Sequence, residues 1–255
     1  MSNEHRNFVA RHYGPRAAAY VESSVHAAGE DLDHIAALVR GRSGARVLDL
    51  GCGGGHVSLR AAPHVAEVVA CDVSDEMLDA VRRTAADRGV DGIRVKRCAA
   101  EALPFAAGSF DIVLSRFSAH HWSDLDAGLR EARRVLKADG LAVFVDSASP
   151  GRPLLDTHLQ AVELLRDATH VRNYTADEWL AALARAGFVV TSMRSRTLRI
   201  EFASWLARTA TSKLHADAIR SLQRHAPAEV RTHFRIEADG SFFLDALLLE
   251  AKNGV

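Results

Sequence analysis

The chain has 255 residues, of which 48% are hydrophobic and 25% are charged, and its 32 basic side chains balance its 32 acidic ones. This length and composition predict one compact α/β domain over residues 1–255. The balanced charge provides no basic field for nucleic acid or an anionic membrane, so we expect neither as a partner. Residues 1–16 lack an apolar signal core, and no run of 18 apolar residues follows. We therefore expect a cytoplasmic protein without membrane insertion, either a monomer or a homodimer.

Helical and strand-like segments alternate along the first half of the chain. A helical segment over residues 1–40, interrupted at Gly29, precedes a core over residues 45–146. Strand-like apolar runs recur in that core at residues 46–50, 67–71, 93–97, 110–115 and 141–145. Strands that alternate with helices form parallel sheets, because each crossover helix returns the chain to the same edge.

The second half has a different pattern. A capping box at Thr175 and Glu178 begins a helix, and a long strand is expected at residues 188–200. A last strand at residues 242–252 has no crossover helix beside it, so we expect it to be antiparallel. The predicted fold is a mostly parallel seven-stranded sheet with helices on both faces.

A glycine-rich turn follows the first expected strand. It reads Asp-Leu-Gly-Cys-Gly-Gly-Gly from Asp49 to Gly55. Glycine permits positive φ and close approach of a ligand to the backbone, and the amides at the following helix start are donors. Asp72 ends the next strand about 20 residues later, where a carboxylate can accept hydrogen bonds from ribose hydroxyls. The pattern predicts a site for a nucleotide cofactor.

The spacing of the glycines distinguishes between cofactors. A dinucleotide fingerprint that starts at Gly51 requires glycine where the chain has His56. S-adenosylmethionine has no pyrophosphate, so a shorter G-x-G-x-G turn is sufficient for it. The spacing therefore favours S-adenosylmethionine over a nicotinamide cofactor, and a turn that binds nothing is the structural alternative.

The cysteines and histidines do not predict a metal site. Cys52, Cys71 and Cys98 lack C-x-x-C spacing and are expected to be free thiols in a reducing compartment. The adjacent histidines His120 and His121 would diverge on an extended chain, and no acidic cluster completes a ligand set.

Further motifs resemble those of class I S-adenosylmethionine-dependent methyltransferases. Besides the glycine turn and Asp72, these motifs are residues 100–105 (AEALPF), 109–113 (SFDIV) and 135–140 (VLKADG). The chain resembles the group that is similar to quinone-biosynthesis C-methyltransferases, and residues 14–20, 118–122 and 170–174 also resemble the YafE-type bacterial methyltransferases. The resemblance implies a Rossmann-like fold, S-adenosylmethionine as cofactor and S-adenosylhomocysteine as product. It leaves the acceptor unassigned.

The resemblance also implies which residues bind the cofactor. The turn would lie against the methionyl part with Asp49 near its ammonium group, and Asp72 would bind the ribose. Ala99 stands where many relatives have an acid for the adenine amino group, so we expect backbone recognition at Ala100 instead. The implied set is Tyr20, Asp49, Gly51, Cys52, Gly53, Gly55, Asp72, Val73, Met77, Ala100, Glu101, Ser115 and Arg116.

The predicted topology also locates the acceptor. Strands that end near Asp146 and Ile200 lead into residues 147–175 and 202–235, which we expect to cover the site as a partly helical lid. His121 follows the carboxyl end of the fourth strand and titrates near neutrality, so it is the candidate base or acceptor-orienting residue; simple packing is the alternative. The other candidates for the acceptor pocket are Tyr13, His120, Arg172, Tyr174, Trp205 and Phe234.

These patterns predict a methyltransferase that acts on a small-molecule acceptor by in-line displacement. A methyltransferase of protein or RNA is one alternative, and a non-catalytic module that binds S-adenosylmethionine is another. The choice between carbon, oxygen and nitrogen as the methylated atom stays open.

Overall fold

The computed structural model describes residues 4–17 and 29–254, so the cofactor candidate Tyr20 lies outside the described residues. Its centre is a seven-stranded sheet in the order β3-β2-β1-β4-β5-β7-β6. The strands are β1 Arg46–Leu50, β2 Glu67–Asp72, β3 Ile93–Arg97, β4 Phe110–Arg116, β5 Leu136–Ala148, β6 Phe188–Ile200 and β7 Phe242–Asn253. The first five strands are mutually parallel, and β7 lies antiparallel to both β5 and β6. The predicted sheet is therefore confirmed.

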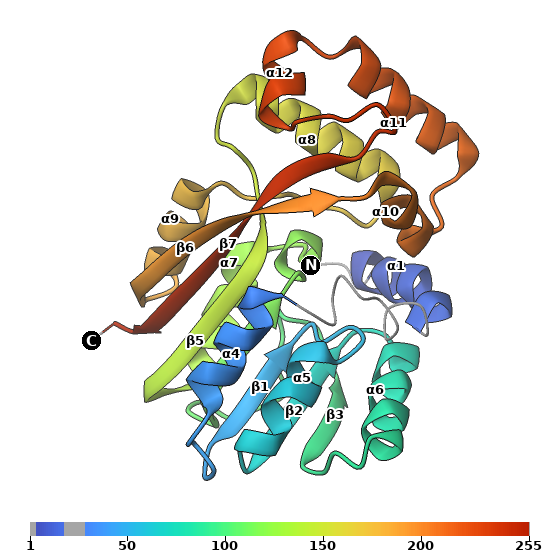
Figure 1. Ribbon diagram of the computed structural model, residues 1–255. Helices are drawn as coiled ribbons and strands as arrows, with labels where there is room; N and C mark the ends of the chain where they lie inside the picture. The colour runs from blue at the N-terminus through green and yellow to red at the C-terminus, as the bar shows by residue number, and fades with distance from the viewer. Residues whose placement is uncertain (1–3, 18–28, 255) are drawn as a thin grey trace.

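Helices surround the sheet and extend beyond one of its edges (Figure 1). The α-helices are α1 Glu4–Tyr13, α4 Glu30–Val39, α5 His56–Ala61, α6 Asp75–Asp87, α7 Leu125–Val135, α8 Pro153–Arg166, α9 Ala176–Arg185, α10 Phe202–Thr209, α11 Lys213–His225 and α12 Ala228–His233. Short 3-10 turns lie at η1 Gly14–Arg16, η2 Ala62–His64 and η3 Ala119–His121. Among the described helices, none is long and apolar enough to cross a membrane.

Side-chain oxygens determine where several helices begin. Ser74 Oγ accepts a hydrogen bond from the backbone of Met77 at the start of α6, and Asp124 caps α7 in the same way. Thr175 and Glu178 form the predicted capping box of α9. Such caps satisfy amides of the first turn that have no partner within the helix. These three helix starts were encoded locally.

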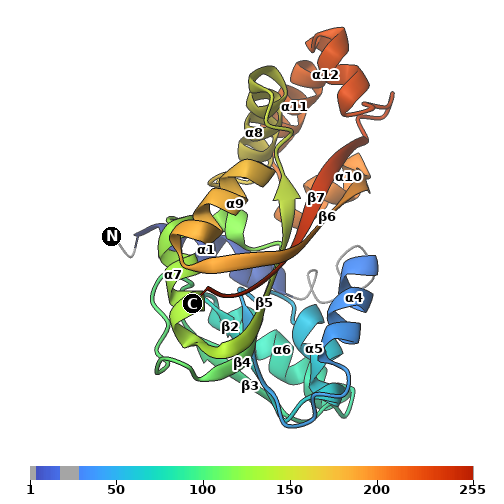
Figure 2. The same cartoon turned by 90° about the vertical axis from the view of Figure 1, so that its left-hand side faces the viewer.

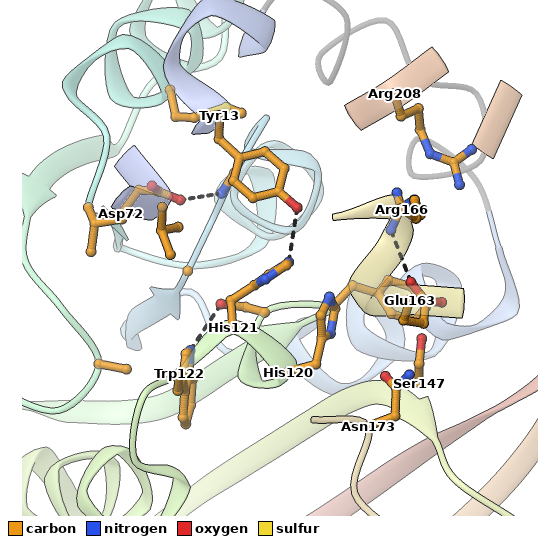
Figure 3. Close-up of a pocket in the computed structure, with 18 of the residues that line it drawn as sticks. Tyr13, Asp72, His120, His121, Trp122, Ser147, Glu163, Arg166, Asn173 and Arg208 are labelled. Carbon is orange, nitrogen blue, oxygen red and sulfur yellow. Dashed lines mark hydrogen bonds and ion pairs between the residues drawn. The ribbon is translucent and has the colours of Figure 1, made fainter. Parts of the chain in front are cut away.

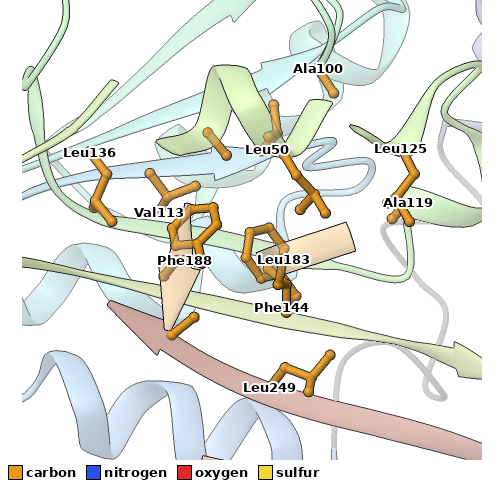
Figure 4. Packing of buried hydrophobic residues seen from close by; sticks show 14 of the residues in the cluster. Leu50, Ala100, Val113, Ala119, Leu125, Leu136, Phe144, Leu183, Phe188 and Leu249 are labelled. Carbon is orange, nitrogen blue, oxygen red and sulfur yellow. The ribbon is translucent and has the colours of Figure 1, made fainter. Parts of the chain in front are cut away.

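The alternation of side chains along the strands places a core on each face of the sheet. On β1, Val47 faces α4 and α5, whereas Leu48 faces α7 and α9. Figure 2 views the layers from the side, with α7 and α9 on one face and α4 and α5 on the other. Figure 4 shows the α9 face, where Leu183 packs with Phe144 and Phe188.

A third apolar cluster lies beyond the carboxyl ends of β5 and β6. Helices α8, α10, α11 and α12 pack there with the end of β6 and the start of β7. Both strands are long, 13 and 12 residues, so they reach past the short strand β1 and carry these helices above the sheet (Figure 1). The helices come from the two segments expected to form the lid.

The fifth strand differs from the sequence-based expectation. It begins at Leu136, directly after α7, and ends at Ala148, whereas the apolar run indicated residues 141–145. Pairing with β4 on one side and β7 on the other extends it, and a register shift between Phe110 and Ile112 accommodates its polar start.

Truncation of a core side chain in α9 tests this packing. Leu183 is fully buried, so we expect Leu183→Ala to lower the free energy of unfolding by about 2 to 5 kcal/mol through lost burial and a residual cavity. Leu214 in α11 is 76% exposed, so Leu214→Ala should change it by less than about 0.5 kcal/mol. Urea unfolding of both variants measures the difference. Equal losses would contradict the assigned core.

Candidate active site

A cavity of about 450 Å³ opens at the carboxyl ends of β1, β2, β4 and β5. That volume is typical of sites for small molecules. One half is lined by the glycine turn, the end of β2 and the start of α6, and the other half by η3, α8 and α10. Figure 3 shows Tyr13 and His121 between these halves, with Asp72 on one side and the pair of Glu163 and Arg166 on the other.

The glycines of the turn are required by its geometry. Gly51, Gly53 and Gly55 all have positive φ, of 71°, 48° and 78°. A Cβ at Gly51 would lie 1.8 Å from Ser118 Oγ, whereas a Cβ at Gly53 would meet no atom within 4 Å. Gly53 lines the cavity, so its open side leaves the backbone free to contact a ligand.

The carboxylate of Asp72 is fixed at the edge of the cavity. Its Oδ2 accepts a hydrogen bond of 2.9 Å from the amide of Gly53, and its Oδ1 accepts one of 3.0 Å from the amide of Ser74. Burial raises the pKa of Asp72, although these hydrogen bonds oppose the shift. The group is a preorganised acceptor with lone pairs left for hydroxyl donors.

Asp49 lies behind the turn rather than in the cavity lining. Its Oδ2 accepts hydrogen bonds from the amide and hydroxyl of Ser58 at 3.0 and 2.6 Å. Alternation along β1 places it on the face of α5, which carries Ser58. Burial raises the pKa of Asp49 to about 6, and nearby Asp72 adds to the increase, although the hydrogen bonds from Ser58 act to lower it.

An apolar surface continues from Asp72. Val73, Met77 and Ala100 line the cavity there. Glu101 also lines it, and its Oε1 accepts hydrogen bonds from the amide and hydroxyl of Ser123 at 2.9 and 2.7 Å. Helix α1 covers this half with His5, Arg6, Val9 and Tyr13.

His121 is held on several sides. Its Nε2 lies 3.1 Å from the hydroxyl of Tyr13, which donates a hydrogen bond to Asp167. Its Nδ1 lies 3.2 Å from Thr169 Oγ1 and 3.3 Å from the Thr169 carbonyl oxygen. Burial, together with the charge of His120, lowers the pKa of His121 well below its ordinary value although Asp167 opposes this. The ring is therefore neutral at physiological pH.

His120 has a different environment although it is the adjacent residue. Its Nδ1 lies 2.5 Å from Asp146 Oδ1, and its amide donates to Asp146 Oδ2 at 3.2 Å. Burial lowers the pKa of His120, but Asp146, with help from Glu163 and Asp167, outweighs burial and raises it above the ordinary value.

Residues 147–175 and 202–235 contribute polar and aromatic groups to the second half of the cavity. Glu163 and Arg166 of α8 form an ion pair of 3.3 Å, and Arg166 Nε donates to the carbonyl of Trp205. Ser147, Asn173, Trp205 and Arg208 complete this side. Within the described part of the chain, no group of three or more His, Cys, Asp and Glu side chains is arranged to hold a metal ion.

Comparison with known proteins gives a consistent result. A family model described as a methyltransferase domain matches residues 48–144. The uncharacterized protein YafE of Escherichia coli is 45% identical over 197 residues, which cover 77% of this chain and 95% of YafE. The uncharacterized methyltransferase YcgJ of Bacillus subtilis is 35% identical over 243 residues, 93% of this chain and 96% of YcgJ.

The chain belongs to the class I S-adenosylmethionine-dependent methyltransferases. The crystal structure of YcgJ superposes with a TM-score of 0.84 at 34% identity, over 88% of this chain and 98% of YcgJ. A malonyl-[acyl-carrier protein] O-methyltransferase of Methylococcus capsulatus is 32% identical over 86% of this chain and 82% of its own length. The family and the cofactor expected from the sequence are thereby confirmed.

The site of this methyltransferase fits its cofactor. Gly53 leaves open space beside the backbone, Asp72 presents a fixed carboxylate, and Met77 adds an apolar surface. S-adenosylmethionine carries a cationic methionyl end, ribose hydroxyls and a flat base, which match a carboxylate, open backbone amides and apolar side chains. Of the predicted cofactor residues, seven line the cavity: Gly51, Gly53, Asp72, Val73, Met77, Ala100 and Glu101.

Several predicted residues of the methyltransferase lie elsewhere. Ser115 is buried within β4, and alternation places Arg116 on the α4 face, where it pairs with Asp31. The chain turns at Phe117, which has a φ of 50°, so Phe117 and Ser118 line the cavity instead. Cys52 and Gly55 shape the turn without lining the cavity, and all three cysteines are free.

Three acceptor candidates are also outside the cavity lining. Arg172 pairs with Glu178 and Asp156 at 3.0 and 3.2 Å. Tyr174 packs against Trp179, and Phe234 is buried in the apolar cluster of α8, α10, α11 and α12. Tyr13, His120, His121 and Trp205 do line the cavity.

The sequence analysis missed Glu163, Arg166, Asn173 and Arg208 as lining residues. Their only common signal was membership of the two lid segments. It also missed the partnership of Asp146 with His120, although Asp146 was recognised as the end of a strand. The register between β4 and β5 decides that Asp146 meets His120, and no local sequence motif indicates such a pair.

The buried carboxyl of Asp49 predicts an unusual dependence of stability on pH. Its pKa rises from 3.8 to about 6 on folding, so its contribution is most favourable below pH 3.8 and is lost as the pH rises through about 6. We expect Asp49→Asn to raise the free energy of unfolding near pH 8 by up to about 3 kcal/mol, from about two pKa units at 1.36 kcal/mol each. The gain should shrink towards about pH 4.

Urea unfolding across this pH range measures the effect. Asp87→Asn is the matched control, since Asp87 is exposed at the end of α6 and should show no such gain. A destabilised Asp49→Asn variant at about pH 8 would contradict the assigned burial penalty.

Proposed function

We propose that this methyltransferase transfers the methyl group of S-adenosylmethionine to a small-molecule acceptor held under the lid. The observation that carries the proposal is the single cavity that joins the glycine turn and Asp72 to His120, His121 and Trp205. A cofactor at the turn and an acceptor at the histidines would then share one continuous space. A cavity of about 450 Å³ favours a small acceptor over a folded macromolecule.

In this proposal each half of the cavity has a separate task. Asp72 accepts hydrogen bonds from the ribose, the open backbone at Gly53 approaches the methionyl part, and Met77 packs on the base. Asp49 supports the turn from behind through Ser58 and contributes negative charge opposite the ammonium group. Ala100 offers its backbone to the adenine edge.

Positioning is the main catalytic contribution. When bound, S-adenosylmethionine supplies an activated methyl group with a neutral thioether as leaving group. Tyr13 and His121 divide the two halves and would orient the acceptor in line with the methyl group, while α1 and the lid exclude water. Orientation and exclusion of water can together contribute several kcal/mol to lowering the barrier.

Two observations bear on the alternatives. The balanced net charge disfavours RNA as a substrate. The similarity to a malonyl-[acyl-carrier protein] O-methyltransferase keeps a carrier-bound acid as a second candidate acceptor.

Three free thiols and the sequence composition support a reducing, cytoplasmic setting.

Incubation with isotope-labelled S-adenosylmethionine and a cell extract that contains metabolites, protein and RNA tests the reaction. A labelled product of low molecular mass would support the proposal. Label on protein or RNA would replace it with the macromolecular alternative. Cofactor binding without any labelled product would indicate a binding module.

Removal of the Asp72 carboxylate tests the cofactor half. We expect Asp72→Ala to weaken binding of S-adenosylmethionine by about 100-fold or more, because two hydrogen bonds to a charged group contribute about 1.5 to 3 kcal/mol each. Titration calorimetry measures the affinity, and the exposed α6 variant Asp87→Ala should bind as the wild type does.

Because Asp72 also holds the amides of Gly53 and Ser74, Asp72→Asn is the second variant. It keeps one acceptor for these amides and should still lose affinity. Binding by both Asp72 variants within about 3-fold of the wild type would refute the assigned role.

A further inference from the structure

The fold brings His120 and Asp146 together from neighbouring strands. His120 lies in η3 just after β4, and Asp146 lies near the carboxyl end of β5. Arg116 pairs with Val145 at the end of the parallel ladder, so the next residues of both strands meet at the cavity. Alternation along β5 turns Val145 towards α4 and α5 and Asp146 towards η3.

Asp146 fixes the orientation of the His120 ring. One carboxylate oxygen of Asp146 lies 2.5 Å from His120 Nδ1, and the other accepts a hydrogen bond of 3.2 Å from the backbone amide of His120. A carboxylate at Nδ1 favours the tautomer with hydrogen on that nitrogen, which leaves the lone pair on Nε2. No described residue bonds Nε2, and His120 lines the cavity beside Glu163 and Ser147 (Figure 3).

The groups that face His120 come from several elements. Asp146 lies on β5, Glu163 on α8 and Asp167 in the following loop, and all three act to raise the pKa of His120 against burial. The ring of His121 packs against it at an interplanar angle of 52°, with ring centroids 4.1 Å apart, and the ring centroid of His170 lies 6.0 Å away. Arg166 is paired to Glu163 at 3.3 Å. The net effect raises the pKa of His120, so these neighbours stabilise the ring once it has taken up a proton.

His121 lacks these properties. Both of its ring nitrogens already face partners, Tyr13 at Nε2 and Thr169 at Nδ1. Its pKa is lowered, chiefly by burial and by the charge of His120. It is therefore suited to orient Tyr13 and the acceptor rather than to take a proton.

We propose that His120, positioned by Asp146, is the general base of the methyl transfer, and that the acceptor is a protic nucleophile. This inference rests on the proposed function. As the acceptor atom's electron pair bonds to the methyl carbon, the lone pair of His120 Nε2 takes the proton from that atom. The electron pair of the broken carbon–sulfur bond stays on sulfur. The positive charge moves from the sulfonium to the imidazolium of His120, beside Asp146, and the proton then passes to solvent.

Histidine NMR on the protein without substrates tests the dyad independently of turnover. Long-range proton–nitrogen spectra of ¹⁵N-histidine protein report the tautomer and titration of each ring, and His120→Gln assigns the signal. We expect His120 to carry its hydrogen on Nδ1 and to titrate above His121. Asp146→Asn should lower the pKa of His120. A His120 that titrates below His121, or that is indifferent to Asp146→Asn, would overturn the inference.

Turnover of the acceptor that the labelling experiment identifies supplies the second arm. We expect His120→Gln to lower kcat by about 10²- to 10⁴-fold without changing the affinity for S-adenosylmethionine. Asp146→Asn should move the pH profile of kcat to lower pH, an effect that a merely structural role would not produce. His215→Gln, at an exposed position of α11, is the matched control and should match the wild type.

The outcomes separate this inference from the proposed function. Labelled product with His120→Gln within about 3-fold of the wild type would refute the base and leave the methyltransferase proposal standing. A larger loss of kcat in His121→Gln than in His120→Gln would give the role to His121. If the wild type yields no small-molecule product, the proposed function fails, and the NMR result alone decides whether the dyad exists.

Discussion

The parallel order of β1, β2, β4 and β5 is the constraint on which the site depends. It brings four strand ends to one edge of the sheet, so that Gly53, Asp72, His120 and Asp146 meet although they are far apart in the sequence. Crossover helices cover the sheet faces, which leaves this edge as the place where backbone amides and side chains can meet a ligand. The long strands β6 and β7 then carry a separately packed helical layer above the same edge.

The carboxylates near the glycine turn differ from Asp31 in whether the protein pairs them with a cation. Asp49 is buried and Asp72 is partly buried, both have neutral hydrogen-bond partners, namely Ser58, Gly53 and Ser74, and both have raised pKa values. A carboxylate in that state is complementary to a cationic ligand such as a sulfonium with an ammonium group. Asp31, in contrast, is neutralised within the protein by Arg116 and Arg196. Asp49 and Asp72 thus remain without an ion-pair partner among the described residues, in the part of the site where the cationic cofactor is expected.

Two adjacent histidines illustrate how environment decides chemistry. His120 and His121 have the same intrinsic titration, but Asp146 raises the pKa of one, whereas burial and its neighbour lower the pKa of the other. A shift in opposite directions for two like groups in one site is a frequent basis for the division of acid–base roles. The sequence reasoning chose His121 because it follows a strand end, and that criterion does not separate it from His120.

The sequence by itself determined the sheet, and it marked the glycine turn and the acid that line one half of the cavity. Apolar runs, the glycine turn and Asp72 are local signals, and the capping residues Ser74 and Thr175 mark helix starts directly. The acceptor half was decided by tertiary structure. The alternation of side chains along β4 decided that Arg116 points to Asp31 and not into the cavity. The register between neighbouring strands decided that Asp146 pairs with His120. Local propensity carries no information on such long-range contacts, since a residue's neighbours across the sheet are set by packing of the whole chain.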